Sequence, residues 1–97
     1  MKKMELNKLM DILDDVKKID SMILLHQNLD DSKFMTSQYQ AKKTKLVSQL
    51  IDQVVTSSIQ SEQRFSLIQL VIGKYYPGIN KDKITYDEDI DQLVAAI

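Results

Sequence analysis

Two charged side chains interrupt the apolar pattern of this sequence, and their types suggest either an acid/base pair or an ion pair. Asp20 lies in an apolar stripe between Val16 and Ile23, and Lys43 lies in a second stripe one turn before Leu46 and Val47. An acid/base pair needs a nucleophile or a second carboxylate nearby. Neither converges on these positions. We therefore interpret Asp20 and Lys43 as a structural pair that fixes the register of two packed helices.

The apolar residues around the two charges support the same register. In an antiparallel helical hairpin, the residue numbers of facing positions add up to a constant value. If Asp20 faces Lys43, the other facing pairs are apolar: Leu9 with Val54, Leu13 with Leu50, and Val16 with Val47. A shift of one helical turn would place each charge against an apolar side chain, and an unpaired buried charge costs several kcal/mol.

The elements that must position this pair are helices. Gly73 is the first glycine and Pro77 is the only proline, so no helix breaker precedes residue 73. Apolar residues recur at the i, i+3, i+4 spacing that is typical of amphipathic helices. We predict an all-α fold of one domain, residues 1–97, that resembles a four-helix bundle. A long antiparallel hairpin carries two shorter helices packed on it. The expected bounds are about 4–28 and 33–55 for the hairpin, and about 58–76 and 86–97 for the short helices.

The end of the chain contains a helix-start pattern. Thr85-Tyr86-Asp87-Glu88 matches a capping box, in which Thr85 caps the last helix. Tyr75 and Tyr86 fall on apolar stripes, so we expect both rings to pack inside the protein. Tyr76 falls at the edge of its stripe and is the better candidate for contact with a partner.

Composition excludes several classes of function. The 97 residues include 13 basic and 14 acidic side chains, which gives a net charge of -1. This balance gives no electrostatic reason to expect nucleic acid or a membrane surface as a partner. There are no cysteines, so thiol chemistry and thiolate metal sites are excluded. The basic start is followed by acidic residues instead of an apolar segment, and no membrane span is present. We expect a cytoplasmic protein.

Neither a metal site nor a cofactor site is expected. His26 is the only histidine and has no second ligand at helical spacing. Asp87, Asp89 and Asp91 alternate as calcium ligands do, but Gln92 stands where an EF-hand loop needs glycine. The two glycines are too few for a phosphate-binding loop. A non-enzymatic protein is the leading interpretation, and an enzyme is the least favoured one.

Several apolar side chains lie outside or at the edges of the helical stripes and are candidates for partner contact. They are Met10, Met22, Leu25 and Met35, together with Tyr76. The hairpin is longer than the helices available to cover it, and adaptable methionines suit contact surfaces. We therefore predict an interaction or regulatory protein that acts through a helical, partly apolar face as a homodimer. A structural oligomerisation module of a larger assembly is the alternative.

The sequence from Tyr75 to about residue 94 resembles one known family. Tyr75-Tyr76-Pro77, a charged loop and a short final helix are similar to the second half of small four-helix colicin-type immunity proteins. The resemblance implies a four-helix fold and a nuclease partner that contacts the tyrosine pair. The second helix departs from that family, which is acidic there, whereas this chain has Lys42, Lys43 and Lys45. An immunity or antitoxin-like binder is therefore a further alternative. The hairpin also resembles small bacterial helical proteins, which implies no activity.

Overall fold

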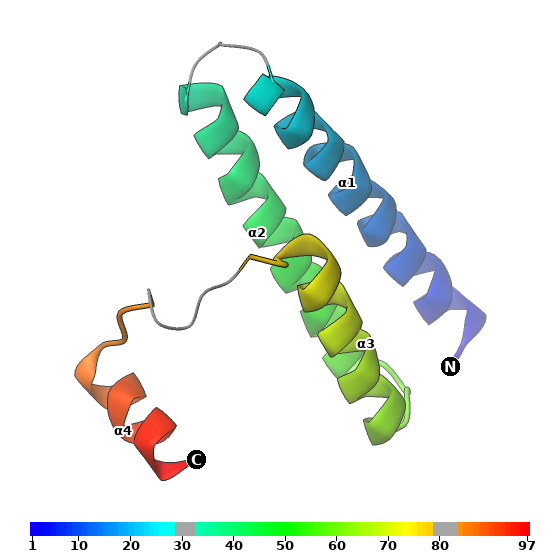
Figure 1. Cartoon of the computed structure of the whole chain (residues 1–97). Coiled ribbons are helices and arrows are strands. Elements are labelled where there is room, and N and C mark those ends of the chain that lie inside the picture. The colour runs from blue at the N-terminus through cyan, green and yellow to red at the C-terminus, as the bar shows by residue number, and fades with distance from the viewer. Residues whose placement is uncertain (29–32, 79–83) are drawn as a thin grey trace.

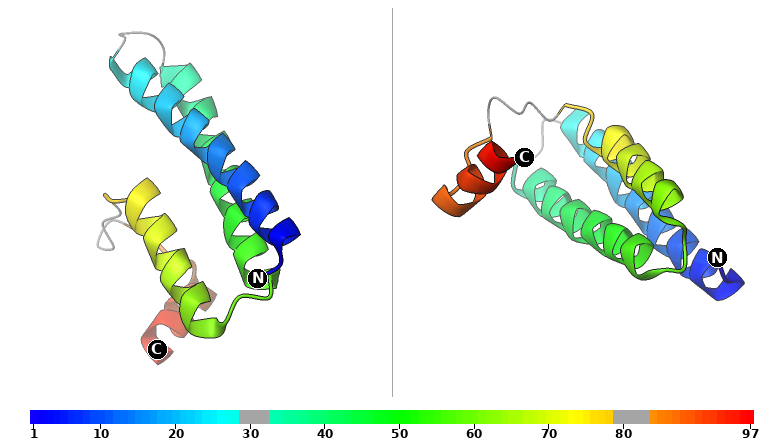
Figure 2. Two further views of the ribbon diagram at one scale, coloured as in Figure 1. Left: turned by 90° about the vertical axis from the view of Figure 1, so that its right-hand side faces the viewer. Right: turned by 90° about the horizontal axis from the view of Figure 1, so that it is seen from below.

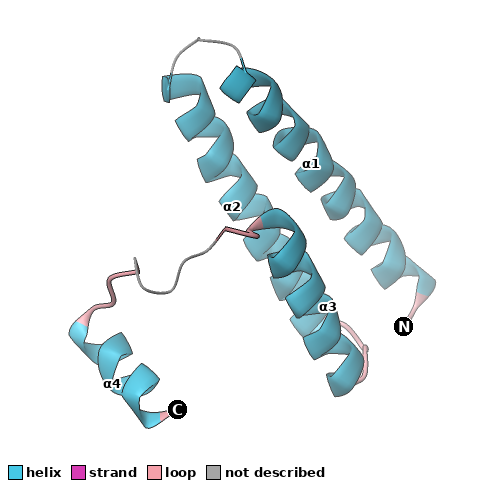
Figure 3. Cartoon of the chain, viewed as in Figure 1, coloured by secondary structure: helices cyan, strands magenta, loops and turns pink. Residues whose placement is uncertain are grey.

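The computed structural model describes residues 1–28, 33–78 and 84–97, and within them it contains four α-helices and no strand (Figures 1 and 3). The helices are α1 (Lys3–Asn28), α2 (Lys33–Thr56), α3 (Ser61–Tyr75) and α4 (Glu88–Ala96). The predicted all-α fold with a long helical hairpin is confirmed. The turn expected between the two long helices falls at residues 29–32, which are outside the described part of the chain.

The helix ends show how local side chains select the boundaries. Thr56 ends α2, and its hydroxyl donates a hydrogen bond to the Asp52 carbonyl at 2.9 Å. At the start of α4 the capping residue is Asp87, whose Oδ1 accepts a hydrogen bond from the Ile90 N–H at 2.9 Å. The prediction that Thr85 is the cap is wrong by two residues. A carboxylate is a stronger acceptor than a hydroxyl for helix N–H groups that the helix dipole makes electropositive.

The core forms along the seam of the hairpin in the predicted register. Leu9, Leu50 and Val54 are buried in one cluster, with Leu13 packed against it. Val16 and Val47 are buried together in a second cluster, and Val16 is completely inaccessible. Each apolar pair expected from the sequence therefore lies within one cluster. Burial of such side chains contributes roughly 1.5–3 kcal/mol each, which makes the seam the main source of stability.

Helix α3 packs on one flank of the hairpin. Leu67, Ile68 and Val71 of α3 pack against the first cluster, and Tyr75 is buried in the second. The loop before α3 contributes Ile59, which is buried with Leu9. The prediction that a short helix packs on the hairpin therefore holds for α3, and the expected burial of the Tyr75 ring is confirmed.

Helix α4 differs from the expected arrangement because it stands apart from the other three helices (Figures 1 and 2). Every residue of α4 is exposed, including its apolar residues Ile90, Leu93 and Val94. Tyr86 is exposed as well, so the expectation that its ring packs inside is wrong. Helical periodicity predicts that a segment has an apolar face, but it does not determine what covers that face.

Candidate functional site

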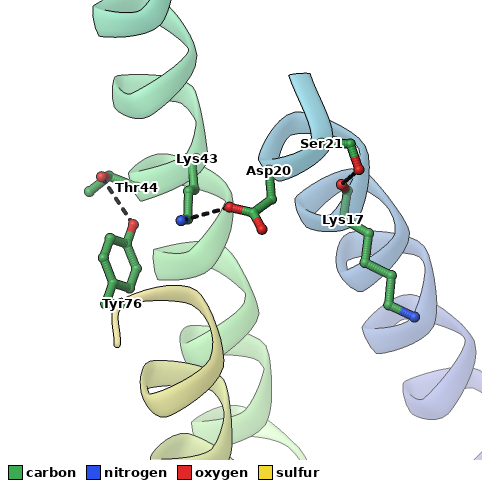
Figure 4. Close-up of polar contacts among 6 residues, drawn as sticks. All are labelled: Lys17, Asp20, Ser21, Lys43, Thr44 and Tyr76. Atoms are coloured by element: carbon green, nitrogen blue, oxygen red, sulfur yellow. Dashed lines mark hydrogen bonds and ion pairs between the residues drawn. The ribbon is translucent and has the colours of Figure 1, made fainter. Parts of the chain in front are cut away.

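The predicted ion pair is present where the two long helices and the end of α3 meet (Figure 4). Lys43 Nζ lies 2.9 Å from Asp20 Oδ1, and the Lys43 side chain is only 13% exposed, against 32% for Asp20. The same ammonium group lies 4.8 Å from the ring centre of Tyr76 and 6.0 Å from that of Tyr75. These distances are within the range of cation–π attraction. Lys43 therefore contacts α1 and α3 at once.

The two tyrosines at the end of α3 are both held by internal contacts. The Tyr76 hydroxyl lies 3.1 Å from Thr44 Oγ1, as Figure 4 shows. Tyr75 is buried, and its hydroxyl has no hydrogen-bond partner among the described residues. Burial raises the pKa of Tyr75, and the negative charge of Asp20 raises it further. The phenol is therefore kept neutral, which suits a packing role better than an acid/base role.

A cleft of about 560 Å³ adjoins the ion pair. Gln27 of α1 and Gln40 of α2 line it, together with Asp20, Lys43 and Tyr76. The carboxylate and one ammonium group in this lining already neutralise each other. Besides this pair the cleft presents amide groups, apolar surface and the ammonium group of Lys74. Among the described residues no second carboxylate lines it, which supports a structural role for the pair.

The residues predicted to contact a partner do not gather in one patch. Met10 and Leu25 of α1 are exposed, whereas Met35 of α2 and Tyr76 are half-buried. Tyr76 lines the cleft beside α3, and Met22 lines a different groove on the hairpin. The structure therefore separates Tyr76 from Met22, and a single partner surface containing all five residues is not formed within one chain.

The groove that contains Met22 runs between α1 and α2 and has a volume of about 380 Å³. Its apolar lining consists of Ile19, Met22, Tyr39 and Leu46, and no residue of α3 contributes to it. Lys18 of α1 and Lys42 of α2 also line the groove, together with Asp15.

The His26 ring contacts the Tyr39 ring at a centroid distance of 5.1 Å. This histidine therefore packs against the wall of the groove.

Sequence reasoning missed a contact that holds the start of α1 against the connection between α2 and α3. The Glu5 carboxylate accepts hydrogen bonds from the Ser58 backbone N–H at 2.7 Å and from the Ser58 hydroxyl at 3.0 Å. These two bonds lower the pKa of Glu5. No spacing rule links residues so far apart in the sequence, so only the tertiary fold reveals this contact.

Arg64 makes a second contact that the sequence did not indicate. Its Nη2 donates hydrogen bonds to the carbonyl of Ile59 at 2.8 Å and to that of Ser57 at 3.4 Å. The arginine therefore holds the loop before α3 in place, which keeps Ile59 in the core.

Within the described ranges, no group of three or more His, Cys, Asp or Glu side chains is placed to hold a metal ion. No helix in those ranges is both long and apolar enough to cross a membrane. Comparison of the chain with protein-family models, with curated proteins and with solved structures gives no match in any of the three. The functional argument therefore depends on the geometry of this chain.

Proposed function

We propose that this chain is a non-enzymatic interaction protein that acts in the cytoplasm through an amphipathic helical face and associates with itself as a homodimer. The observation that carries the proposal is the exposed apolar face of α4. Ile90, Leu93, Val94 and Ile97 share this face, and all four are exposed. An apolar surface of this kind on a folded chain is typical of an interaction site.

The length of α4 strengthens the argument. The helix has nine residues, whereas isolated helices shorter than about 12 residues are marginal in water. Most helical stability in proteins comes from packing of the apolar face against another element. Among the described residues nothing buries the apolar face of α4, so a partner surface is the source of stability that its amphipathic pattern requires.

The unequal lengths of the helices favour a second copy of the chain as the partner. Helices α1 and α2 have 26 and 24 residues, whereas α3 has 15, so α3 leaves part of the hairpin uncovered. A chain of 97 residues buries a smaller share of its surface than a large domain does, and self-association adds burial. Tyr75 and Tyr76 are held by internal contacts, so no observation favours the immunity-type alternative.

Size-exclusion chromatography with light scattering tests the proposal on the full chain at micromolar concentration. The expected mass is twice the 11.2 kDa of one chain. Leu93→Asp places a charge on the apolar face of α4 and is expected to give a monomer. Ala95→Asp makes the same change on the opposite face of α4 and should leave the dimer intact. A monomeric mass for the unsubstituted chain would remove the proposal.

A further inference from the structure

The groove between α1 and α2 has a lining that suits the apolar face of one amphipathic helix. Its floor is apolar, with Ile19 buried and Met22 and Leu46 partly accessible. Lys18 and Lys42 line it from opposite helices and are exposed, so each side of the groove has a positive charge. Asp15 is the one acidic residue in the lining. The groove therefore has an apolar centre and a net positive border.

Helix α4 has the complementary pattern. Its apolar face centres on Ile90, and at about 100° per residue Asp89 and Asp91 lie about 100° to either side of Ile90. No basic residue occurs between residues 84 and 97. The helix therefore presents an apolar stripe with a negative charge on each edge, and it matches a groove with a positive charge on each edge.

We propose that α4 of one copy docks in the α1–α2 groove of a second copy, with its apolar stripe on Met22 and Leu46. Asp89 and Asp91 then face Lys18 and Lys42. This inference rests on the proposed homodimer and names the two surfaces that form it. In the proposed homodimer the exchange is reciprocal: each chain inserts its helix into the groove of the other, which is the isologous arrangement of a two-fold dimer.

The position of α4 favours the groove of a second copy over the groove of its own chain. Helix α4 lies on the side of the hairpin that α3 occupies, as the left view of Figure 2 shows. Asp20 and Ile23 of α1 face α3, whereas Lys18 and Met22 line the groove on the other flank of the same helix. A chain's own α4 would have to pass around α2 to reach that groove. A second copy can present its helix there directly.

Cysteine cross-linking tests the pairing directly, because the natural chain has no cysteine. Met22→Cys places a thiol in the groove, and Leu93→Cys places one on the apolar face of α4. The two single variants are mixed under mild oxidation and run on a non-reducing gel. The expected result is a disulfide-linked heterodimer in at least tenfold excess over the control mixtures. The controls are Leu24→Cys, which is exposed on the other flank of α1, and Ala95→Cys, on the opposite face of α4.

The chain that contains both Met22→Cys and Leu93→Cys separates the possible arrangements. Covalent dimers support the proposal, whereas a covalently closed monomer would show that α4 fills the groove of its own chain. If light scattering shows a dimer but the Met22–Leu93 mixture cross-links no better than the controls, the dimer uses another surface. That result overturns this inference and leaves the proposed homodimer standing. A monomer by light scattering would instead remove both.

Charge reversal tests the edges of the interface. Lys18→Glu with Lys42→Glu should weaken self-association about tenfold or more, and Asp89→Lys with Asp91→Lys should do the same. Mixing the two reversed proteins should restore association, because each helix then meets a groove of opposite charge. Failure of the mixture to associate more tightly than either reversed protein alone would contradict the proposed pairing.

Discussion

Lys43 and Asp20 form an ion pair in which the ammonium nitrogen lies 2.9 Å from the carboxylate and the lysine is the more buried partner. The two residues face each other across the seam between α1 and α2. Leu9 and Val54 lie together in one core cluster of the same seam. Val16 and Val47 lie together in the other. A pair of this kind adds little net stability, because desolvation offsets attraction. We propose that the pair instead penalises other registers of the hairpin, in which each charge would lack its partner.

The first prediction concerns the removal of one charge. Asp20→Leu should lower the free energy of unfolding by about 1–3 kcal/mol, because Lys43 then lacks its charged partner in a mostly buried site. Asp20→Leu combined with Lys43→Leu should recover stability to within about 1 kcal/mol of the natural chain, since no buried charge remains. Urea unfolding followed by circular dichroism measures both values.

The matched control is Asp14→Leu, an equivalent change at an exposed position of α1, which should alter the free energy of unfolding by less than about 0.5 kcal/mol. An Asp20→Leu variant as stable as the natural chain would show that the pair does not set the register.

The second prediction concerns Tyr75 at high pH. Because the pKa of Tyr75 is raised above its ordinary value of 10.0, the folded chain holds the phenolic proton more tightly than the unfolded chain does. Its contribution to stability is complete below pH 10.0 and is lost as the pH rises through the raised pKa. Denaturant unfolding over this range should show less loss of stability for Tyr75→Phe than for the natural chain.

Tyr75→Phe should also be at least as stable as the natural chain at neutral pH, since it removes a buried hydroxyl that lacks a hydrogen-bond partner. The exposed Tyr86 provides the control, and Tyr86→Phe should keep the natural dependence on pH. A marked loss of stability in Tyr75→Phe at neutral pH would mean that this hydroxyl makes a stabilising contact.

The third prediction concerns Glu5 at low pH. The pKa of Glu5 is lowered by its hydrogen bonds with Ser58, so its contribution to stability is present above the ordinary pKa of 4.5. That contribution is lost as the pH falls through the lowered pKa, because protonation weakens the carboxylate as an acceptor. Urea titrations from neutral pH to well below 4.5 should show a smaller pH-dependent loss in Glu5→Gln than in the natural chain.

The same change in the first turn of α3, Glu62→Gln, is the control and should leave the pH dependence as in the natural chain. If Glu5→Gln and the natural chain lose stability in parallel over this range, the contact between Glu5 and Ser58 does not contribute to the stability of the chain in solution.

The hairpin and its ion pair could be predicted because both depend on spacing within the sequence. Helical periodicity places Val16 and Asp20 on one face of α1, and the antiparallel pairing rule then brings Asp20 to Lys43. Both predictions need only the geometry of a helix and the requirement that buried charges be paired. The bounds of the long helices follow from the same pattern, to within one or two residues.

The position of α4 and the contact between Glu5 and Ser58 could not be predicted in this way. The first depends on which surface is available to cover Leu93, and the second depends on where the loop before α3 passes α1. Both are set by tertiary packing, which leaves no periodic signal in the sequence. The Thr85 cap was predicted wrongly for a simpler reason: the capping-box pattern considers only the spacing of Thr85 and Glu88, whereas the carboxylate of Asp87 is the stronger acceptor.

Lys43 also links the stability of separate parts of the chain. Its ammonium group contacts Asp20 of α1 and lies over the Tyr76 ring at the end of α3, while the Thr44 hydroxyl beside it contacts the Tyr76 hydroxyl. Separation of α3 from the hairpin would remove aromatic contacts from the same lysine that pairs the two long helices. Docking of α3 and closure of the hairpin are therefore thermodynamically coupled, and α1, α2 and α3 should unfold as one cooperative unit.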